Sequence, residues 1–325
     1  MNDTNIPLLN EKIVKLIENG NVKDAQAASE DYIRTEVLED SFAWKILPVK
    51  QADLNKLERD NSENLRIRYE IMPDTAGARW VPLQTAPESE YLYGSSFFIP
   101  MTRVFTRRME KDIAELYTYD MDIRKVISEI QVKDALKVID AKFVDTVDAV
   151  VYDYDDDTTL YTDGVGYRQS QTGKIQYMQF EEGLNRDTYA EATKMLPRPN
   201  AQGKFVMRNH TILMNEVTAR DWLKMGRDLI GGDLAQTHFT DGLQEAKYMG
   251  INAIFTTKAD IVPENVIYFF AAPEFLGKAL EMHDWATHMK TEAMVATWFH
   301  YWMGGFAFGN IAGFAVAEFN ATIET

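Results

Sequence analysis

The 325-residue chain is long enough to bury a large core and to form two or three domains. A hydrophobic content of 46% and an aromatic content of 12% are typical of a globular protein, and the net charge of −16 argues against a protein that coats nucleic acid by neutralising phosphates. The absence of cysteine excludes disulfides, thiolate nucleophiles and cysteine-based zinc sites.

The N-terminal region is predicted to begin with two helices, over residues 8–20 and 22–39, joined at Gly20-Asn21. Their apolar residues are sparse, and charges of both signs surround them. Because such a pair cannot bury a core by itself, we expect an arm that lies on another part of the molecule. Residues 41–49 are expected to form a strand.

A long hairpin of about 40 residues is predicted next. Apolar and charged residues alternate from Leu65 to Ile71, which indicates a half-buried strand. Residues 73–77 form a turn, residues 78–83 return, residues 85–96 form a tip, and a second extended segment covers 97–106. Pro100 confines that segment to a sheet edge. Since a long hairpin is marginal alone in water, a neighbouring domain or subunit must cover it.

The hairpin is rich in arginine, whereas the whole chain holds 50 acidic and 34 basic residues. We predict that these arginines meet acidic surface on neighbouring subunits; the alternative is that they only solvate a strand face. The subunit-interface candidates are Arg66, Arg68, Arg79, Arg103, Arg107 and Arg108.

The stretch from Met101 to Asp163 contains neither glycine nor proline. Apolar residues within it recur at steps of three and four, which predicts a helix from about Ile123 to Val151, roughly 43 Å long. Charged residues, Asp140 among them, are expected on the other faces. The apolar positions are Ile123, Val126, Ile127, Ile130, Val132, Leu136, Ile139, Phe143, Val147 and Val150. Taken alone, this could be an ordinary long core helix.

The remaining chain reads as mixed helices and strands. Strands and turns are expected over 158–179, a helix over 184–196 and an extended segment over 205–214. Asn215 is expected to cap a helix over 216–225. Core strands follow over 250–257 and 266–270, then a short helix over 273–282 and further strands to Phe319.

An uncharged stretch of 25 residues, Ala293–Ala317, is long enough to cross a membrane. His300, Asn310 and four glycines interrupt it, and no cluster of lysine or arginine flanks it. We therefore expect buried strands here and no membrane partner.

The sequence contains few candidates for a catalytic or metal-binding site. The acidic run Asp153–Asp157 could ligate a divalent cation through carboxylate oxygens, but it lacks the glycine and glutamate positions of a helix–loop–helix calcium site. His283 and His288 are five residues apart, unlike the i, i+4 pair of a helical zinc site. No nucleophile or phosphate-loop motif is present. We expect no enzyme activity, no cofactor, and no catalytic, cofactor-binding or metal-binding residues.

The order of elements resembles the major capsid proteins of tailed bacteriophages, which have the Hong Kong 97-type fold. The stripe from Ile123 to Val150 resembles the spine helix, and Met109–Tyr117 the short helix before it. The segment from Gly250 through Val266–Phe269 resembles the axial-domain strand, turn and strand. Asn310–Phe319 resembles the closing strand.

This resemblance implies an α+β fold with four parts. They are an N-terminal arm at 1–62, an extended-loop hairpin at 63–108, a peripheral domain with the spine helix at 109–165 and 278–306, and an axial domain at 166–277 and 307–325.

The resemblance also implies a function. The chain would be a structural subunit that self-assembles into hexamers and pentamers of an icosahedral shell, enclosing phage double-stranded DNA without sequence-specific binding. It would reside in the virion capsid after assembly in the host cytoplasm. Its partners would be copies of itself, a portal and a decoration protein. Because only about 60 residues precede the hairpin, we expect a separate scaffolding protein.

Two alternatives stay open: the shell protein of an encapsulin-like nanocompartment, and an enzyme with a carboxylate–metal site at Asp153–Asp157. One departure from the resemblance concerns cross-linking, which some family members achieve through a hairpin lysine. No lysine occurs between Lys56 and Lys111, so this hairpin has no candidate.

Overall fold

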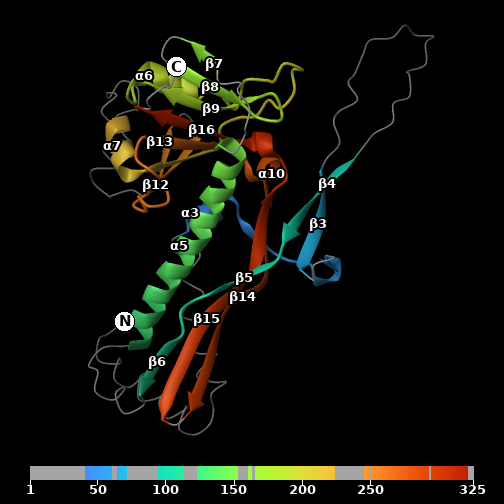
Figure 1. The fold of residues 1–325 in the computed structure, drawn as a ribbon, viewed down its shortest axis with the longest axis vertical. Coiled ribbons are helices and arrows are strands. Elements are labelled where there is room, and N and C mark those ends of the chain that lie inside the picture. Colours follow the sequence, from blue (N-terminus) through green and yellow to red (C-terminus); the bar gives the residue numbers. More distant parts are fainter. Residues whose placement is uncertain are drawn as a thin grey trace, which may run out of the picture.

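A computed structural model describes residues 41–60, 64–71, 94–112, 123–152, 160–162, 165–223, 245–248, 251–292 and 294–320. In this part of the chain, one long helix packs against two sheets, and a third sheet stands to one side of it (Figure 1). The predicted arm helices, the hairpin tip, Arg79 and the acidic run Asp153–Asp157 lie outside the described residues.

The long helix α5 spans Ile123–Tyr152, which confirms the predicted helix. Leu136, Ile139, Phe143 and Val147 of its apolar stripe are at most 3% exposed, and Val150 is partly buried. They share one cluster with residues of both large sheets, such as Tyr268 and Trp302. The helix therefore joins the two sheets through a single continuous core.

The larger sheet has eight strands in the order β11-β12-β10-β13-β16-β9-β8-β7. Their bounds are β7 Leu160–Thr162, β8 Val165–Gln169, β9 Ile175–Phe180, β10 Thr211–Asn215, β11 Glu245–Tyr248, β12 Ile251–Thr256, β13 Val266–Phe270 and β16 Phe314–Phe319. All five residues of β10 and of β13 are buried. This fits a sheet that is covered on both faces.

The two faces of this sheet have different covers. Tyr268 and Phe270 of β13 pack in the α5 core, whereas Ile267 and Phe269 pack in a second cluster on the opposite face. Helices α6 (Arg186–Ala192) and α7 (Glu216–Leu223) contribute to that second cluster. Asn215 accepts a hydrogen bond from the Val217 amide, which confirms its predicted capping role.

The second sheet is built on two long antiparallel strands, β14 (Gly277–Glu292) and β15 (Val295–Phe308). Strand β1 (Val49–Gln51) pairs in parallel with β14, and β5 (Thr102–Phe105) and β6 (Met109–Asp112) pair with β15. The uncharged stretch thus folds largely into β15 and β16. None of the described helices is long and apolar enough to span a membrane.

The third sheet has the order β2-β3-β4, with β2 Leu57–Arg59, β3 Leu65–Ile71 and β4 Ser95–Pro100. Strands β3 and β4 pair antiparallel as the two arms of the predicted hairpin. Strand β4 forms an edge of this sheet, as the position of Pro100 predicted. Short 3-10 turns, η2 (Leu54–Lys56) and η3 (Ile311–Gly313), complete the connections.

Several expected elements were wrong. Residues 42–46 form helix α3 (Phe42–Ile46) and not a strand, because Ser41 caps it by accepting a hydrogen bond from the Trp44 amide. The expected helix over 109–117 begins instead as strand β6, in which half-buried and exposed residues alternate. The short helix α10 (Pro273–Leu276) ends before Gly277, where β14 starts.

Two boundaries also differ from the predictions. Helix α6 covers only Arg186–Ala192 of the expected 184–196, and turns follow it. Strand β10 begins at Thr211, so residues 205–210 belong to no strand.

Asp140 was expected on a solvent face of α5, but it is fully buried. Its Oδ1 accepts hydrogen bonds from the Ser41 hydroxyl (2.6 Å) and the Ala43 amide (3.1 Å), and its Oδ2 lies 2.6 Å from Lys258 Nζ. The buried charge is tolerated because every partner is a donor. This carboxylate ties α3, α5 and the β12–β13 connection together.

We predict that Asp140→Ala lowers the free energy of unfolding by about 3 kcal/mol, because it leaves the Ser41 hydroxyl, the Ala43 amide and Lys258 without their acceptor. Chemical denaturation measures the change. Asp260→Ala is the matched control: it removes another lysine–aspartate contact from α5 to the same connection, but Lys137 and Asp260 are both more than half exposed. Equal losses from the two variants would contradict the proposed role of Asp140.

Candidate assembly surfaces

The base of the hairpin is anchored on the five-stranded sheet of the same chain. Ile67 of β3 and Ile99 of β4 are completely buried and pack with Leu280 of β14 and Ala52. Of the two covers that the sequence left open, a neighbouring domain or a neighbouring subunit, the described base has the first: another sheet of the same chain. Leu280 lies about 200 positions after the hairpin strands in the sequence, so the local pattern could not reveal this contact.

Two glycines allow this close approach. A Cβ at Gly305 would collide with the carbonyl oxygen of Pro100, and a Cβ at Gly309 would collide with the Phe97 ring. Lys278 Nζ lies 3.9 Å from the centre of the Tyr69 ring, and this cation–π contact adds to the attachment of the hairpin base. The base of the hairpin is thus held in a defined orientation.

Two of the predicted interface arginines have ion-pair partners within the chain. Arg66 pairs with Asp60 (3.0 Å) and lies over the Phe98 ring (4.1 Å). Arg108 pairs with Glu110 (3.1 Å). These two arginines already have partners within the chain.

The other three described interface candidates are exposed to solvent. Arg68 on β3, Arg103 on β5 and Arg107 in the β5–β6 connection are exposed, and none forms an ion pair with a described residue. Arg79 lies outside the described residues.

An aromatic face on the five-stranded sheet was missed by the sequence analysis. It consists of Phe105, His283, His288, Phe299 and Tyr301. The ring centres of His288 and Phe299 are 5.0 Å apart, and Phe105, next but one to Arg103, is 56% exposed. The register that pairs Phe105 with Tyr301 brings these distant segments together.

One histidine of β15 belongs to the core. His300 is 1% exposed and its Nδ1 lies 2.8 Å from the Thr287 hydroxyl. Burial lowers the pKa of His300 to about 4. The ring is therefore neutral at pH 7, in keeping with a structural position.

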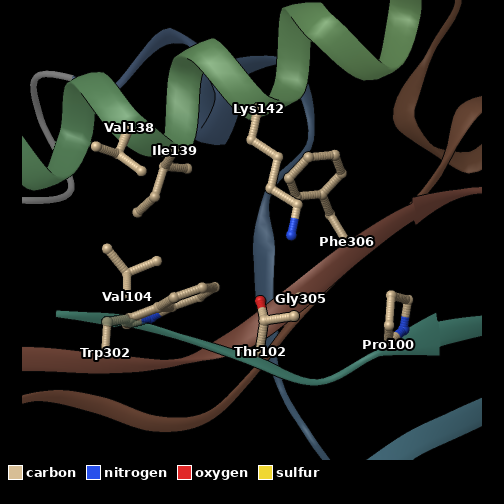
Figure 2. A pocket seen from close by; sticks show the side chains of 9 residues that line it. All are labelled: Pro100, Thr102, Val104, Val138, Ile139, Lys142, Trp302, Gly305 and Phe306. Atoms are coloured by element: carbon tan, nitrogen blue, oxygen red, sulfur yellow. The ribbon is translucent and has the colours of Figure 1, made fainter. Parts of the chain in front are cut away.

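A small cavity lies between α5 and the hairpin side of the five-stranded sheet. Figure 2 shows Lys142 reaching from α5 toward the sheet beside Phe306, with Val104 and Trp302 on the facing wall. Its volume of about 30 Å³ holds one or two water molecules. No group of three or more His, Asp or Glu side chains in the described residues could hold a metal ion.

No protein-family model and no curated protein matches this sequence. Solved structures do match. The capsid subunit of a native GTA particle superposes with a TM-score of 0.51 at 12% identity, covering 85% of this chain and 89% of that one. The mature capsid of bacteriophage PhiM1 gives 0.53 at 8%, covering 87% and 88%. The capsid of cyanophage P-SCSP1u gives 0.53 at 8%, covering 84% and 86%.

The chain has the α+β fold of phage capsid proteins. The likeness extends over most of this chain and most of each matched subunit, so it describes the whole architecture and not one shared motif. Within that capsid fold, the candidate surfaces are the hairpin, the exposed arginines and the aromatic face.

We predict that Gly305→Ala destabilises the chain by about 1–3 kcal/mol, because the added methyl group must displace the backbone at Pro100. The hairpin base should also become more accessible to limited proteolysis. Gly94→Ala is the matched control, since a Cβ there meets nothing within 4 Å. A Gly305→Ala variant as stable and as resistant as Gly94→Ala would contradict the anchored base.

Proposed function

We propose that this protein is the major capsid protein of a phage, a structural subunit that assembles into hexamers and pentamers of an icosahedral shell enclosing double-stranded DNA. The observation that carries the proposal is the match of 84–87% of the chain to subunits of assembled capsids.

The proposal includes a division of the chain into an arm (1–62), a hairpin (63–108), a peripheral domain (109–165 and 278–306) and an axial domain (166–277 and 307–325). The three sheets support it. Strands β3 and β4 belong to the hairpin sheet, β14 and β15 are the main strands of the five-stranded sheet, and β9 to β13 with β16 belong to the eight-stranded sheet. Strands β5 and β7 depart from this division, because β5 pairs with β15 and β7 pairs with β8. In Figure 1, β3 and β4 stand to one side of α5, away from the eight-stranded sheet.

Copies of the same chain are the proposed principal partners. The hairpin, which is held firmly at its base, would extend to an adjacent subunit. Arg68, Arg103 and Arg107 would meet acidic surface there, as would Arg79 in the hairpin. Arg66 and Arg108 would contribute less, because intramolecular ion pairs already engage them.

We further propose a virion location, assembly in the host cytoplasm, and a separate scaffolding protein, a portal and a decoration protein as partners. The net charge of −16 supports a wall that encloses DNA without binding it tightly.

We predict that a shortened hairpin leaves the subunit folded but unable to form shells. The variant replaces residues 73–93 with Asn-Gly, a sequence suited to a two-residue hairpin turn, and keeps the paired strands β3 and β4. Sedimentation velocity measures assembly, and circular dichroism checks the fold. Shell formation equal to that of the wild-type chain would mean that the hairpin is not an intersubunit element.

We predict that Arg103→Glu and Arg107→Glu each slow assembly or raise the concentration that it requires. Exposed ion pairs contribute only about 0–1 kcal/mol each, but every subunit repeats them. Assembly should also weaken near 1 M salt, where the screening length falls to about 3 Å. Light scattering follows the rate and yield.

Arg208→Glu provides the control, because Arg208 is exposed next to the eight-stranded sheet and far in sequence from the hairpin. Assembly that is indifferent to salt, with wild-type behaviour of both reversals, would leave these arginines without a role in assembly.

A further inference from the structure

The end of α5 that meets the eight-stranded sheet carries a carboxylate in an unfavourable position. Asp148 follows the completely buried Val147 and lies against β13, where its Oδ2 accepts a hydrogen bond of 3.3 Å from the Tyr268 hydroxyl. Its Oδ1 is buried and has no hydrogen-bond partner among the described residues. A carboxylate with one long hydrogen bond and one unpaired oxygen is poorly compensated for the loss of water.

The groups around Asp148 do not supply the missing charge. Asp145 lies one turn earlier on α5, and Glu318 on β16 accepts a hydrogen bond of 2.6 Å from Tyr177 on β9. Both acids add negative charge to the same region. The guanidinium of Arg168 on β8 lies 5.2 Å from the centre of the Tyr177 ring and forms no ion pair with Asp148 in the described structure.

Tyrosine side chains also lie near Asp148. Tyr152, in the last turn of α5, packs edge-on against Tyr177 with ring centres 4.9 Å apart. Burial, with Asp148 as the next cause, raises the pKa of Tyr268 and of Tyr152 above the usual range, so both hydroxyls stay neutral. They can donate one hydrogen bond each but cannot neutralise a carboxylate.

We propose that Asp148 makes the joint between α5 and the eight-stranded sheet sensitive to pH: the joint is tighter when the carboxyl is protonated and looser when it is ionised. This inference does not depend on the function proposed above. A neutral carboxyl removes the repulsion from Asp145 and loses less hydration on burial. Because α5 packs against both large sheets, its packing against the eight-stranded sheet affects how firmly the two sheets are held together.

The expected pH range follows from the direction of the pKa shift. Burial raises the pKa of Asp148 from 3.8 to about 6. A carboxyl whose pKa is higher in the folded state contributes stability below the unfolded value, and this contribution is lost as the pH rises through about 6. His300 acts in the opposite direction, because its lowered pKa removes stability as the pH falls from 6.5 toward 4. The two effects overlap, so the wild-type pH profile alone is not diagnostic.

The test compares melting temperatures of the unassembled full-length chain and Asp148→Asn between pH 5 and pH 8. Because His300 is common to both, the difference isolates Asp148. We expect Asp148→Asn to melt at least about 2 °C higher at pH 8, with the gap falling to about half of that value at pH 5. A gap that is constant with pH, a less stable Asp148→Asn at pH 8, or its failure to fold would overturn the proposal.

Asp134→Asn is the matched control, since Asp134 is exposed on the same helix and is not among the groups that act on Asp148. Its melting temperature should differ from that of the wild type by a nearly constant amount. In the wild-type chain, amide exchange corrected for intrinsic rates should also slow over residues 144–152, relative to residues 131–142, as the pH falls from 7.5 to 5.5. Equal responses of the two segments would contradict a joint located at Asp148.

Discussion

The packing of α5 against both large sheets is the interaction on which the rest of the structure depends. Phe143 is completely buried and its ring contacts Phe270 of the eight-stranded sheet as well as Phe306 and Phe308 of the five-stranded sheet. One aromatic side chain thus touches strands that pair with different neighbours. Burying an apolar side chain of this size contributes about 1.5–3 kcal/mol, and the stripe repeats such contacts along the helix.

Two carboxylates lie at this apolar interface, and their surroundings differ in charge and in hydrogen bonding. Asp140 is surrounded by donors and fixes the position of α5 relative to α3 and the β12–β13 connection. Asp148, two turns later, has one long hydrogen bond and acidic neighbours. A well-compensated carboxylate holds the middle of the helix, whereas a poorly compensated one lies at the end that meets the eight-stranded sheet.

The sequence predicted those elements whose signal is local. The 3.6-residue period identified α5, and a continuous apolar run identified β13. It failed where distant partners decide the outcome. Asp140 looks like any solvent-facing charge on a helix, because Ser41 and Lys258 are 99 and 118 residues away. Strand β6 is mostly charged and forms because β15 offers it an edge.

The candidate assembly surfaces were only partly predictable for the same reason. Alternation identified β3 as half-buried, but it could not indicate that Leu280 covers the hairpin base. The arginines were visible as a composition bias, whereas the ion pair of Arg66 with Asp60 needed the fold. The aromatic face depends entirely on the register between β5, β15 and β14, which joins residues nearly 200 positions apart.

These observations describe a chain in which one core joins α5 to both large sheets and the base of the hairpin is anchored on the five-stranded sheet. The proposed function is that copies of this chain assemble into a shell. Electron microscopy of the purified wild-type chain tests that account most directly. We expect closed shells, tubes, or rings of five or six subunits. A chain that stays monomeric under every assembly condition would contradict it.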